Sequence, residues 1–134
     1  MIKIFKLKKI KVESGDVLKI LDKRSIGFTK FGEAYFSLVD FKKIKGWKKH
    51  TKMKMNLVVP IGNVEFVFFD QKKNFFKKYK IGEDNYKRIT VEPGIWFAFR
   101  GLSKKTNLVL NVSNIIHDPK ESKNIDLSSI KYSW

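Results

Sequence analysis

The sequence predicts an all-β protein, and three observations carry that prediction. Short segments that alternate apolar and polar side chains, as a half-buried strand does, recur along the chain. Turns rich in Gly, Pro and Asn separate them at spacings of about 8 to 12 residues, which is typical of a sandwich or a barrel. No segment sustains the spacing of three and four residues that marks an amphipathic helix, and no capping box precedes an apolar run.

Each expected strand rests on its own pattern. Residues 2–12 alternate apolar and basic side chains with a period of two, and residues 64–69 form the strongest apolar strand segment. Residues 42–47 are polar, and the pattern of residues 75–81 is ambiguous. In chain order, the expected strands cover residues 2–12, 17–21, 34–39, 53–59, 64–69, 86–91, 95–99 and 107–112.

Turn chemistry separates these strands. Gly and Asn accept the backbone conformations that tight turns need, and Pro cannot continue a central strand. After the last expected strand, residues 114–134 are polar, and we expect an irregular tail there. The predicted turns lie at Ser14-Gly15-Asp16, Pro60-Ile61-Gly62-Asn63, Gly82-Glu83-Asp84-Asn85 and Glu92-Pro93-Gly94.

Length and composition fit a single domain over residues 1–134. Hydrophobic residues make up 43% of the chain and twelve residues are Phe, which is enough apolar material for a core at this size. There is no cysteine, so disulfides and thiolate metal sites are excluded. The N-terminal residues alternate apolar with basic, which predicts no signal peptide, and no apolar run approaches the roughly 20 residues of a membrane span. We therefore expect a cytoplasmic protein.

The net charge of +16 raises the question of a nucleic-acid partner. The lysines are scattered along the whole chain, and the only arginines are Arg24, Arg88 and Arg100. Proteins that bind nucleic acid favour arginine for two-pronged contacts to phosphate and guanine. A solvated lysine surface explains the charge better, and nucleic acid is not the expected partner.

Few residues point to metal or cofactor chemistry. The two histidines, His50 and His117, fall short of the three imidazoles and a carboxylate that a metal-binding barrel of this kind uses, so we expect no metal. Glycine-rich phosphate loops and a nucleophile elbow are also missing, and we expect no cofactor.

His50 lies in a lysine-rich segment, 45–52. Histidine changes its charge near neutral pH and therefore suits acid–base work. Neighbouring lysines favour the neutral, basic form of the imidazole by like-charge repulsion. The alternative is that His50 is a surface histidine in a basic loop. The residues alone favour neither this alternative nor an acid–base role.

Aromatic and amide side chains add binding candidates. Aromatic faces stack on sugars and bases, but a phenylalanine is more often simply buried in the core. The better stacking candidates are Tyr35, Trp47 and Trp96, because they lie beside polar residues or turns. Asn56 and Asn111 interrupt otherwise apolar strands, which predicts that they point into the interior.

Several short motifs occur in an order that resembles the short members of the dTDP-4-dehydrorhamnose 3,5-epimerase family, which are RmlC-like cupins. Each motif is weak alone, and the resemblance extends from about residue 15 to the end. The motifs are Phe31-Gly32-Glu33-Ala34-Tyr35-Phe36-Ser37, Lys45-Gly46-Trp47 with His50, Val59-Pro60-Ile61-Gly62, Phe68-Phe69-Asp70, Gly82-Glu83-Asp84-Asn85-Tyr86, Val91-Glu92-Pro93-Gly94-Ile95-Trp96-Phe97-Ala98-Phe99, His117-Asp118-Pro119-Lys120-Glu121 and Tyr132-Ser133-Trp134.

The resemblance implies a single cupin jelly-roll β-barrel, a homodimer, and a ligand in the barrel mouth. Enzymes of the family act without metal on 4-keto sugars attached to a nucleoside diphosphate. A histidine removes a proton next to the ketone, an enolate forms, and an acid returns a proton, while cationic side chains stabilise the oxyanion and the diphosphate.

The resemblance also shows departures at the catalytic positions. The family's histidine base falls at Lys48, and His50 matches a second histidine found two positions later in short members. A further family histidine falls at Phe97, the acid tyrosine falls near His117, and Lys45 replaces a substrate-binding arginine.

Three interpretations remain open at this stage. In the first, the protein is an epimerase or related isomerase in cell-surface polysaccharide synthesis. In the second, the barrel binds a nucleotide sugar or glycan without chemistry, and in the third the basic surface binds nucleic acid or acidic polysaccharide. We favour the first, with His50, Lys48 and His117 as catalytic residues. The expected substrate-binding residues are Lys45, Trp47, Tyr35, Asn56, Trp96, Arg100 and Asn111.

Overall fold

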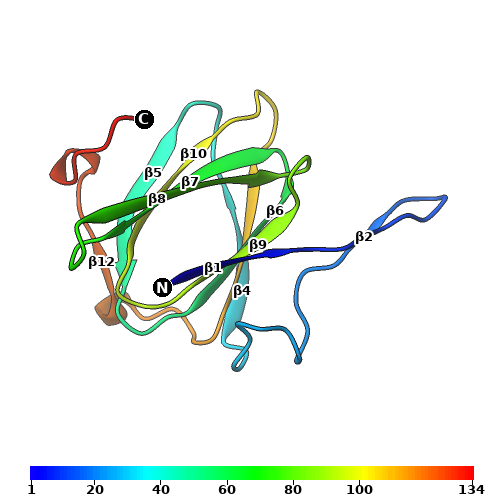
Figure 1. The fold of residues 1–134 in the computed structure, drawn as a ribbon, viewed down its shortest axis with the longest axis horizontal. Helices are drawn as coiled ribbons and strands as arrows, with labels where there is room; N and C mark the ends of the chain where they lie inside the picture. Colours follow the sequence, from blue (N-terminus) through cyan, green and yellow to red (C-terminus); the bar gives the residue numbers. More distant parts are fainter.

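The protein is a barrel of two facing antiparallel sheets, described by a computed structural model that covers residues 1–134 (Figure 1). A separate hairpin, β2 (Lys9–Ile10) with β3 (Val17–Leu18), projects away from the barrel. The first sheet has the order β1 (Ile2–Lys6), β9 (Lys87–Val91), β6 (Met55–Ile61), β11 (Leu108–Ser113) and β4 (Glu33–Leu38). The second has the order β12 (Ser122–Asn124), β5 (Ile44–His50), β10 (Trp96–Gly101), β7 (Asn63–Asp70) and β8 (Phe75–Gly82).

The main core fills the space between the two sheets. Period-two alternation sends every second side chain inward, as with Met55, Leu57 and Val59 of β6. On the second sheet, the inward side chains of β7 and β10 form an aromatic layer. Its members are Phe66, Phe68, Phe97 and Phe99, with ring centroids 5.4 to 6.5 Å apart in the contacting pairs. The prediction of an all-β barrel is confirmed.

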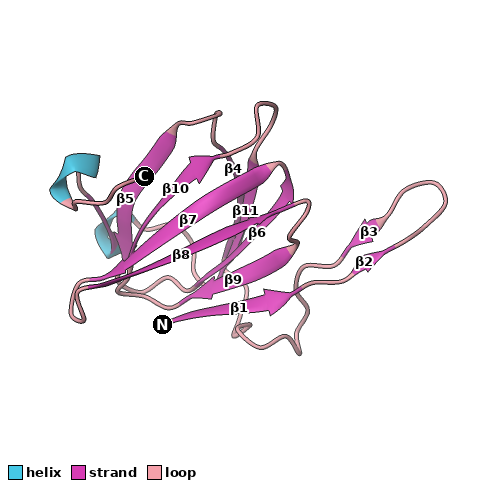
Figure 2. Ribbon diagram, turned by 45° about the horizontal axis from the view of Figure 1, so that its top comes forward, coloured by secondary structure: helices cyan, strands magenta, loops and turns pink.

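The C-terminal tail covers the outer face of the second sheet (Figure 2). Trp47 packs there against Trp134, with ring centroids 6.1 Å apart, and donates its indole N–H to the carbonyl of Leu127. Backbone hydrogen bonds in both directions join Trp47 to Ile125. The tail is mostly irregular, as expected, but it also contains β12 and two short 3-10 turns, η1 (Pro119–Glu121) and η2 (Leu127–Ser129).

The outer face of the first sheet is covered over only part of its area. The side chain of Arg88 donates to the carbonyls of Ile20 and Ile26, and therefore holds the segment 20–26 across β9. Further along the same face, Phe36, Leu38 and Ile61 leave 63%, 56% and 47% of their side chains exposed. We call these three side chains the exposed apolar strip.

Strand β5 was missed by the sequence patterns, and its geometry gives the reason. The register between β5 and β10 shifts between Phe97 and Ala98, so that Lys48 faces Phe97 and Gly46 faces Ala98. Trp47 is the extra residue, which is the arrangement of a β-bulge. The bulge breaks the period of two and leaves Lys45 and Lys48 on the same side of the strand.

Other strands differ from the expected ones mainly in their boundaries. The expected strand 2–12 is divided into β1 and β2, and the ambiguous segment 75–81 is a full strand, β8. Strand β6 continues through Pro60, and the turn is made at Gly62, whose φ is 81°. The structure contains no helix of the length and apolar character that a membrane crossing requires.

Candidate active site

A cavity of about 500 Å³ opens between β4, an edge strand of the first sheet, and β5, which lies next to the short edge strand β12 in the second sheet. We call this place the β4–β5 seam. Strand β4 forms one wall, and strands β5 and β10 form the facing wall. The lining residues are Glu33, Tyr35, Ser37, Lys45, Gly46, Lys48, Phe97, Phe99, His117 and Asn124.

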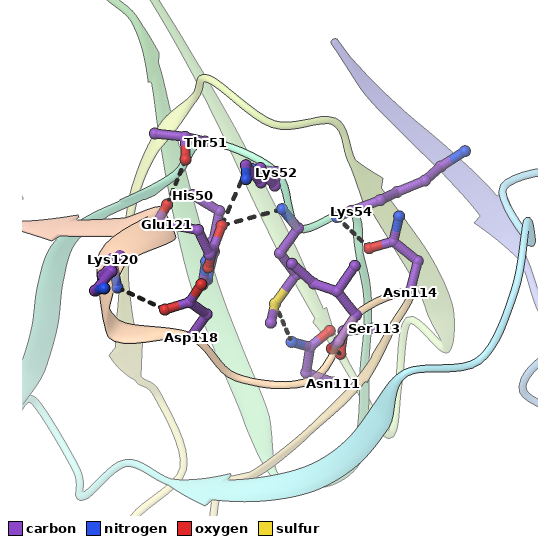
Figure 3. Close-up of polar contacts among 12 residues, drawn as sticks. His50, Thr51, Lys52, Lys54, Asn111, Ser113, Asn114, Asp118, Lys120 and Glu121 are labelled. Carbon is purple, nitrogen blue, oxygen red and sulfur yellow. Dashed lines mark hydrogen bonds and ion pairs between the residues drawn. The ribbon is translucent and has the colours of Figure 1, made fainter.

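Behind this cavity, His50 and Glu121 form a buried pair at the end of β5 (Figure 3). The Nδ1 atom of His50 lies 2.5 Å from Oε1 of Glu121, and the His50 side chain is only 3% exposed. The two residues are 71 positions apart, and the segment from β11 to β12 brings Glu121 to the strand. Glu121 closes η1, whose first turn is capped by the Asp118 side chain, 3.0 Å from the backbone N–H of Lys120.

The local backbone holds Glu121 in its ionised form. Its second oxygen accepts hydrogen bonds from the backbone N–H groups of Lys52 and Met53, both at 3.1 Å. Burial raises the pKa of Glu121, but the hydrogen bonds from His50, Lys52 and Met53 outweigh it and hold the pKa below its ordinary 4.5. A carboxylate can only accept hydrogen bonds, so Nδ1 of His50 carries the proton.

The imidazole of His50 is neutral, with a free lone pair on its other nitrogen. Burial lowers the pKa of His50 below 6.5, and the charges of Lys48 and His117 lower it further, against the opposing effect of Glu121. The Nε2 atom is buried and has no hydrogen-bond partner. With Nδ1–H fixed on Glu121, Nε2 has the character of a general base. The ring of Phe97 lies beside the imidazole, 6.0 Å away and tilted by 18°.

The cavity in front of this pair is cationic. Lys45, Lys48 and His117 line it, and neither lysine forms an ion pair with an acidic side chain. Free ammonium groups around a cavity are suited to hold phosphate oxygens or a developing oxyanion.

The β4 wall of the cavity supplies neutral and acidic groups. The hydroxyl of Tyr35 accepts a hydrogen bond of 3.0 Å from the side-chain amide of Asn111, which itself points into the barrel. The amide oxygen of Asn111 and one carboxylate oxygen of Glu33 are buried without a partner. Unpaired buried acceptors beside a cavity are groups that a ligand's hydroxyl or N–H can satisfy.

Of the ten residues singled out from the sequence, the structure brings six together at this seam. Lys45, Lys48, Tyr35 and His117 line the cavity, while His50 and Asn111 lie directly behind its walls. Lys48 and His117 are close enough to His50 to affect its pKa.

The other four lie elsewhere. Trp47 and Trp96 point out of the barrel into the cluster under the tail. Arg100 also lies on that outer face, where it binds the buried carboxylate of Glu65 at 2.8 Å and stands 5.7 Å from the ring of Trp134. Asn56 does not point into the barrel but outward, because its neighbours in β6 fill the core.

Each of these four is already occupied by a structural contact. Asn56 donates to the carbonyl of Gly27 and accepts from Thr90. Trp96 donates to Gln71, and the ammonium of Lys49 lies over its ring.

Sequence reasoning missed Glu121 and Glu33 as site residues. Both were inside motifs that carried the family resemblance, His117-Asp118-Pro119-Lys120-Glu121 and Phe31-Gly32-Glu33, but nothing in their spacing linked them to His50. No group of three or more His, Cys, Asp or Glu side chains is placed to hold a metal ion.

Comparison with solved structures identifies the class of protein to which this chain belongs. No protein-family model and no curated protein sequence matches the chain. Solved structures do match it, and they are RmlC-type epimerases and related sugar isomerases. The protein is therefore an RmlC-like cupin.

One relative narrows this class to a family. A dTDP sugar isomerase from Desulfovibrio desulfuricans G20 is 31% identical, has a TM-score of 0.93, and is matched over 99% of this chain and 90% of that one. The chain belongs to the dTDP-sugar isomerase family.

Two more distant structures share the fold. A sugar 3,4-ketoisomerase from Thermoanaerobacterium thermosaccharolyticum, solved with TDP, has a TM-score of 0.78 at 18% identity, over 91% of this chain and 86% of that one. A dTDP-6-deoxy-D-glucose-3,5-epimerase from Legionella pneumophila has a TM-score of 0.82 at 17% identity, over 94% of this chain and 73% of that one.

Proposed function

We propose that the protein is a 3,5-epimerase or related isomerase of a dTDP-4-keto-6-deoxy sugar, acting in cell-surface polysaccharide synthesis. The observation that carries the proposal is the buried His50–Glu121 pair beside a cationic cavity. The names of the structural relatives, which are dTDP-sugar isomerases and epimerases, support the choice of substrate class.

The chemistry follows from the substrate's ketone. A 4-ketone acidifies the C–H bonds at the adjacent carbons, because the electron pair left behind delocalises onto the carbonyl oxygen as an enolate. Nε2 of His50 accepts the proton, and the imidazolium that forms is stabilised by Glu121 through Nδ1–H. Return of a proton to carbon regenerates the ketone, so the reaction needs no other reagent.

Lysines on the same wall stabilise the charges. Lys48 is the nearer of the two to His50 along β5, and we assign it to the enolate oxygen. Lys45 lies further along the strand and is assigned to the diphosphate.

The proton donor decides the outcome of the reaction. Tyr35 stands on β4, across the cavity from β5, so a proton delivered from its hydroxyl would reach the opposite face of the enolate and invert the carbon. His117 lines the same cavity and is assigned the exchange of protons with solvent. Removal of the proton at C3 by His50 and its return to C4, with the proton of the 3-hydroxyl passing to the oxygen at C4, would instead give a ketoisomerase.

A second function is favoured by one specific observation. Nε2 of His50 is shielded from solvent, and Phe97 occupies a position next to the imidazole where the family resemblance implies a histidine. A barrel that keeps its cavity but shields Nε2 of His50 from the ligand would bind a nucleotide sugar without converting it.

The homodimer is part of the same proposal. The exposed apolar strip of Phe36, Leu38 and Ile61 is apolar surface that the chain itself leaves uncovered, so it is a face that a second copy could bury. Sedimentation analysis should give a dimer, and Phe36→Lys should give a monomer. A wild-type monomer at assay concentration would remove this part of the proposal.

The function is tested by incubating the protein with dTDP-4-keto-6-deoxyglucose and following the sugar by proton NMR. A new 4-keto or 3-keto sugar, formed by the wild type and not by His50→Ala, supports the isomerase. Binding, seen as a raised melting temperature, together with unchanged sugar signals supports the second function, a barrel that binds the nucleotide sugar without converting it.

A further inference from the structure

A second cavity lies at the opposite junction of the two sheets, between β1 and β8. We call this place the β1–β8 seam (Figure 1 shows both strands). Its volume is about 380 Å³. The apolar lining consists of Met1, Ile2, Phe68, Phe75 and Ile95, and the charged lining of Lys3, Asp70, Lys73 and Lys77.

The seam is open because β1 and β8 are both edge strands. Each ends its sheet, and no backbone ladder joins one to the other. Phe68, an inward member of the aromatic layer, lies at the bottom of the opening, and Phe75 stands at its rim with 53% of its side chain exposed. An apolar space is therefore left between the sheets and accessible from outside.

The charges around this space are unbalanced. Lys3, Lys73 and Lys77 form no ion pair. The single carboxylate, Asp70, accepts hydrogen bonds from the backbone N–H groups of Lys72 and Lys73 at 3.1 and 3.2 Å, as the cap of the β7–β8 turn. Lysines on edge strands also prevent edge-to-edge association, but that role requires no apolar cavity beneath them.

We propose that the β1–β8 seam binds a small anion with an apolar body, an alkyl or aryl carboxylate. The apolar side chains would bury the body of the ligand, and the lysine ammonium groups would hold the carboxylate at the mouth. The cavity lacks the array of polar side chains that a sugar or a nucleoside would need, so its ligand differs in class from that of the β4–β5 seam.

The binding test uses two probes and two controls. Sodium decanoate supplies an alkyl carboxylate and sodium 1-naphthoate an aryl one, while decanol and inorganic phosphate supply the apolar body and the charge alone. In methyl NMR titrations, we expect decanoate or naphthoate to move the signals of Met1, Ile2 and Ile95. Whichever of the two binds more tightly identifies the body of the ligand. Binding should weaken as salt is added.

A matched pair of variants separates the cavity from the general charge of the surface. The double variant Lys3→Glu, Lys77→Glu should lower affinity for the carboxylate roughly tenfold or more. Lys104→Glu, Lys105→Glu changes the net charge equally, at exposed positions that line neither cavity, and should leave the affinity unchanged.

Three results would overturn the proposal. These are equal loss of affinity in both double variants, shifts spread over the whole lysine surface, and decanol binding as tightly as decanoate. Because both double variants keep the His50 site, the result is independent of whether the proposed isomerase activity is found.

Discussion

The two seams of the barrel differ in one respect that decides their chemistry. Both are openings between the two sheets, and both are lined by lysines and by phenylalanines of the same aromatic layer. Only the β4–β5 seam has a buried histidine behind its wall, with a carboxylate fixed to one nitrogen. Positive charge therefore defines what each seam attracts, but only the His50–Glu121 pair gives one of them a base.

The segment between β11 and β12 creates this difference. It crosses from the first sheet to the second at the β4–β5 seam and carries both His117 and Glu121. The segment between β9 and β10 also crosses from the first sheet to the second and contributes Ile95 to the β1–β8 cavity, but it carries no histidine. Changes at one seam should therefore act on turnover, and changes at the other should not.

Removal of the base should give the largest effect. His50→Ala should lower turnover at least a hundredfold, because general-base catalysis contributes about 10² to 10⁴. The assay is product formation from dTDP-4-keto-6-deoxyglucose, with the melting temperature as a control for folding. A loss of less than threefold would remove His50 from the mechanism.

Removal of the Glu121 carboxylate charge should give the second largest effect on turnover. Glu121→Gln should lower kcat at least tenfold with a smaller change in KM, because a neutral amide no longer stabilises the imidazolium. Kinetics over a range of substrate concentrations separates the two constants. An unchanged kcat in a folded variant would leave Glu121 a purely structural residue.

The pH dependence of stability should follow the same pair. The pKa of His50 is lower in the folded protein than the ordinary 6.5, so the unfolded chain takes up the proton first as the pH falls. The stability from His50 is thus complete above pH 6.5 and is lost as the pH falls through the folded pKa. Glu121, with a pKa below 4.5, adds a loss in the same direction at lower pH.

Urea denaturation at a series of pH values between about 8 and 4 would measure this slope. The wild type should lose stability steadily below pH 6.5, and His50→Phe should be flatter between pH 6.5 and 5. Stability that rises as the pH falls through this range would mean that His50 is protonated in the folded protein.

Substrate affinity should depend on Lys45. Lys45→Met should raise KM by roughly tenfold and leave kcat within about threefold, because the lysine is assigned to the diphosphate rather than to the reacting carbons. A large fall in kcat with unchanged KM would instead place Lys45 at the enolate.

The smallest effect is expected at the other seam. Lys3→Glu, Lys77→Glu should leave turnover within about twofold, since both residues line only the β1–β8 cavity. Turnover that falls with this variant, and not with Lys104→Glu, Lys105→Glu, would show that the two seams are coupled.

Local patterns and the family resemblance predicted the barrel and part of the site. Turn chemistry and period-two alternation located most strands because those strands are apolar on one face. Strand β5 escaped because its bulge at Trp47 breaks the period and places two lysines toward the cavity. Asn56 was expected to point inward, but the covering segment around Gly27 offers it a partner outside. Glu121 is 71 residues away from His50 in the sequence, so their contact could be found only from the three-dimensional structure.

The most direct test of the account is proton exchange at the substrate's ring carbons. The protein would be incubated with dTDP-4-keto-6-deoxyglucose in heavy water, and the signals at C3 and C5 followed by NMR against a buffer control. With the wild type, deuterium should enter at one or both carbons, and with His50→Ala its incorporation should stay at the buffer rate. Substrate that binds to the wild type and exchanges no faster than in buffer would contradict the claim that His50 is a base.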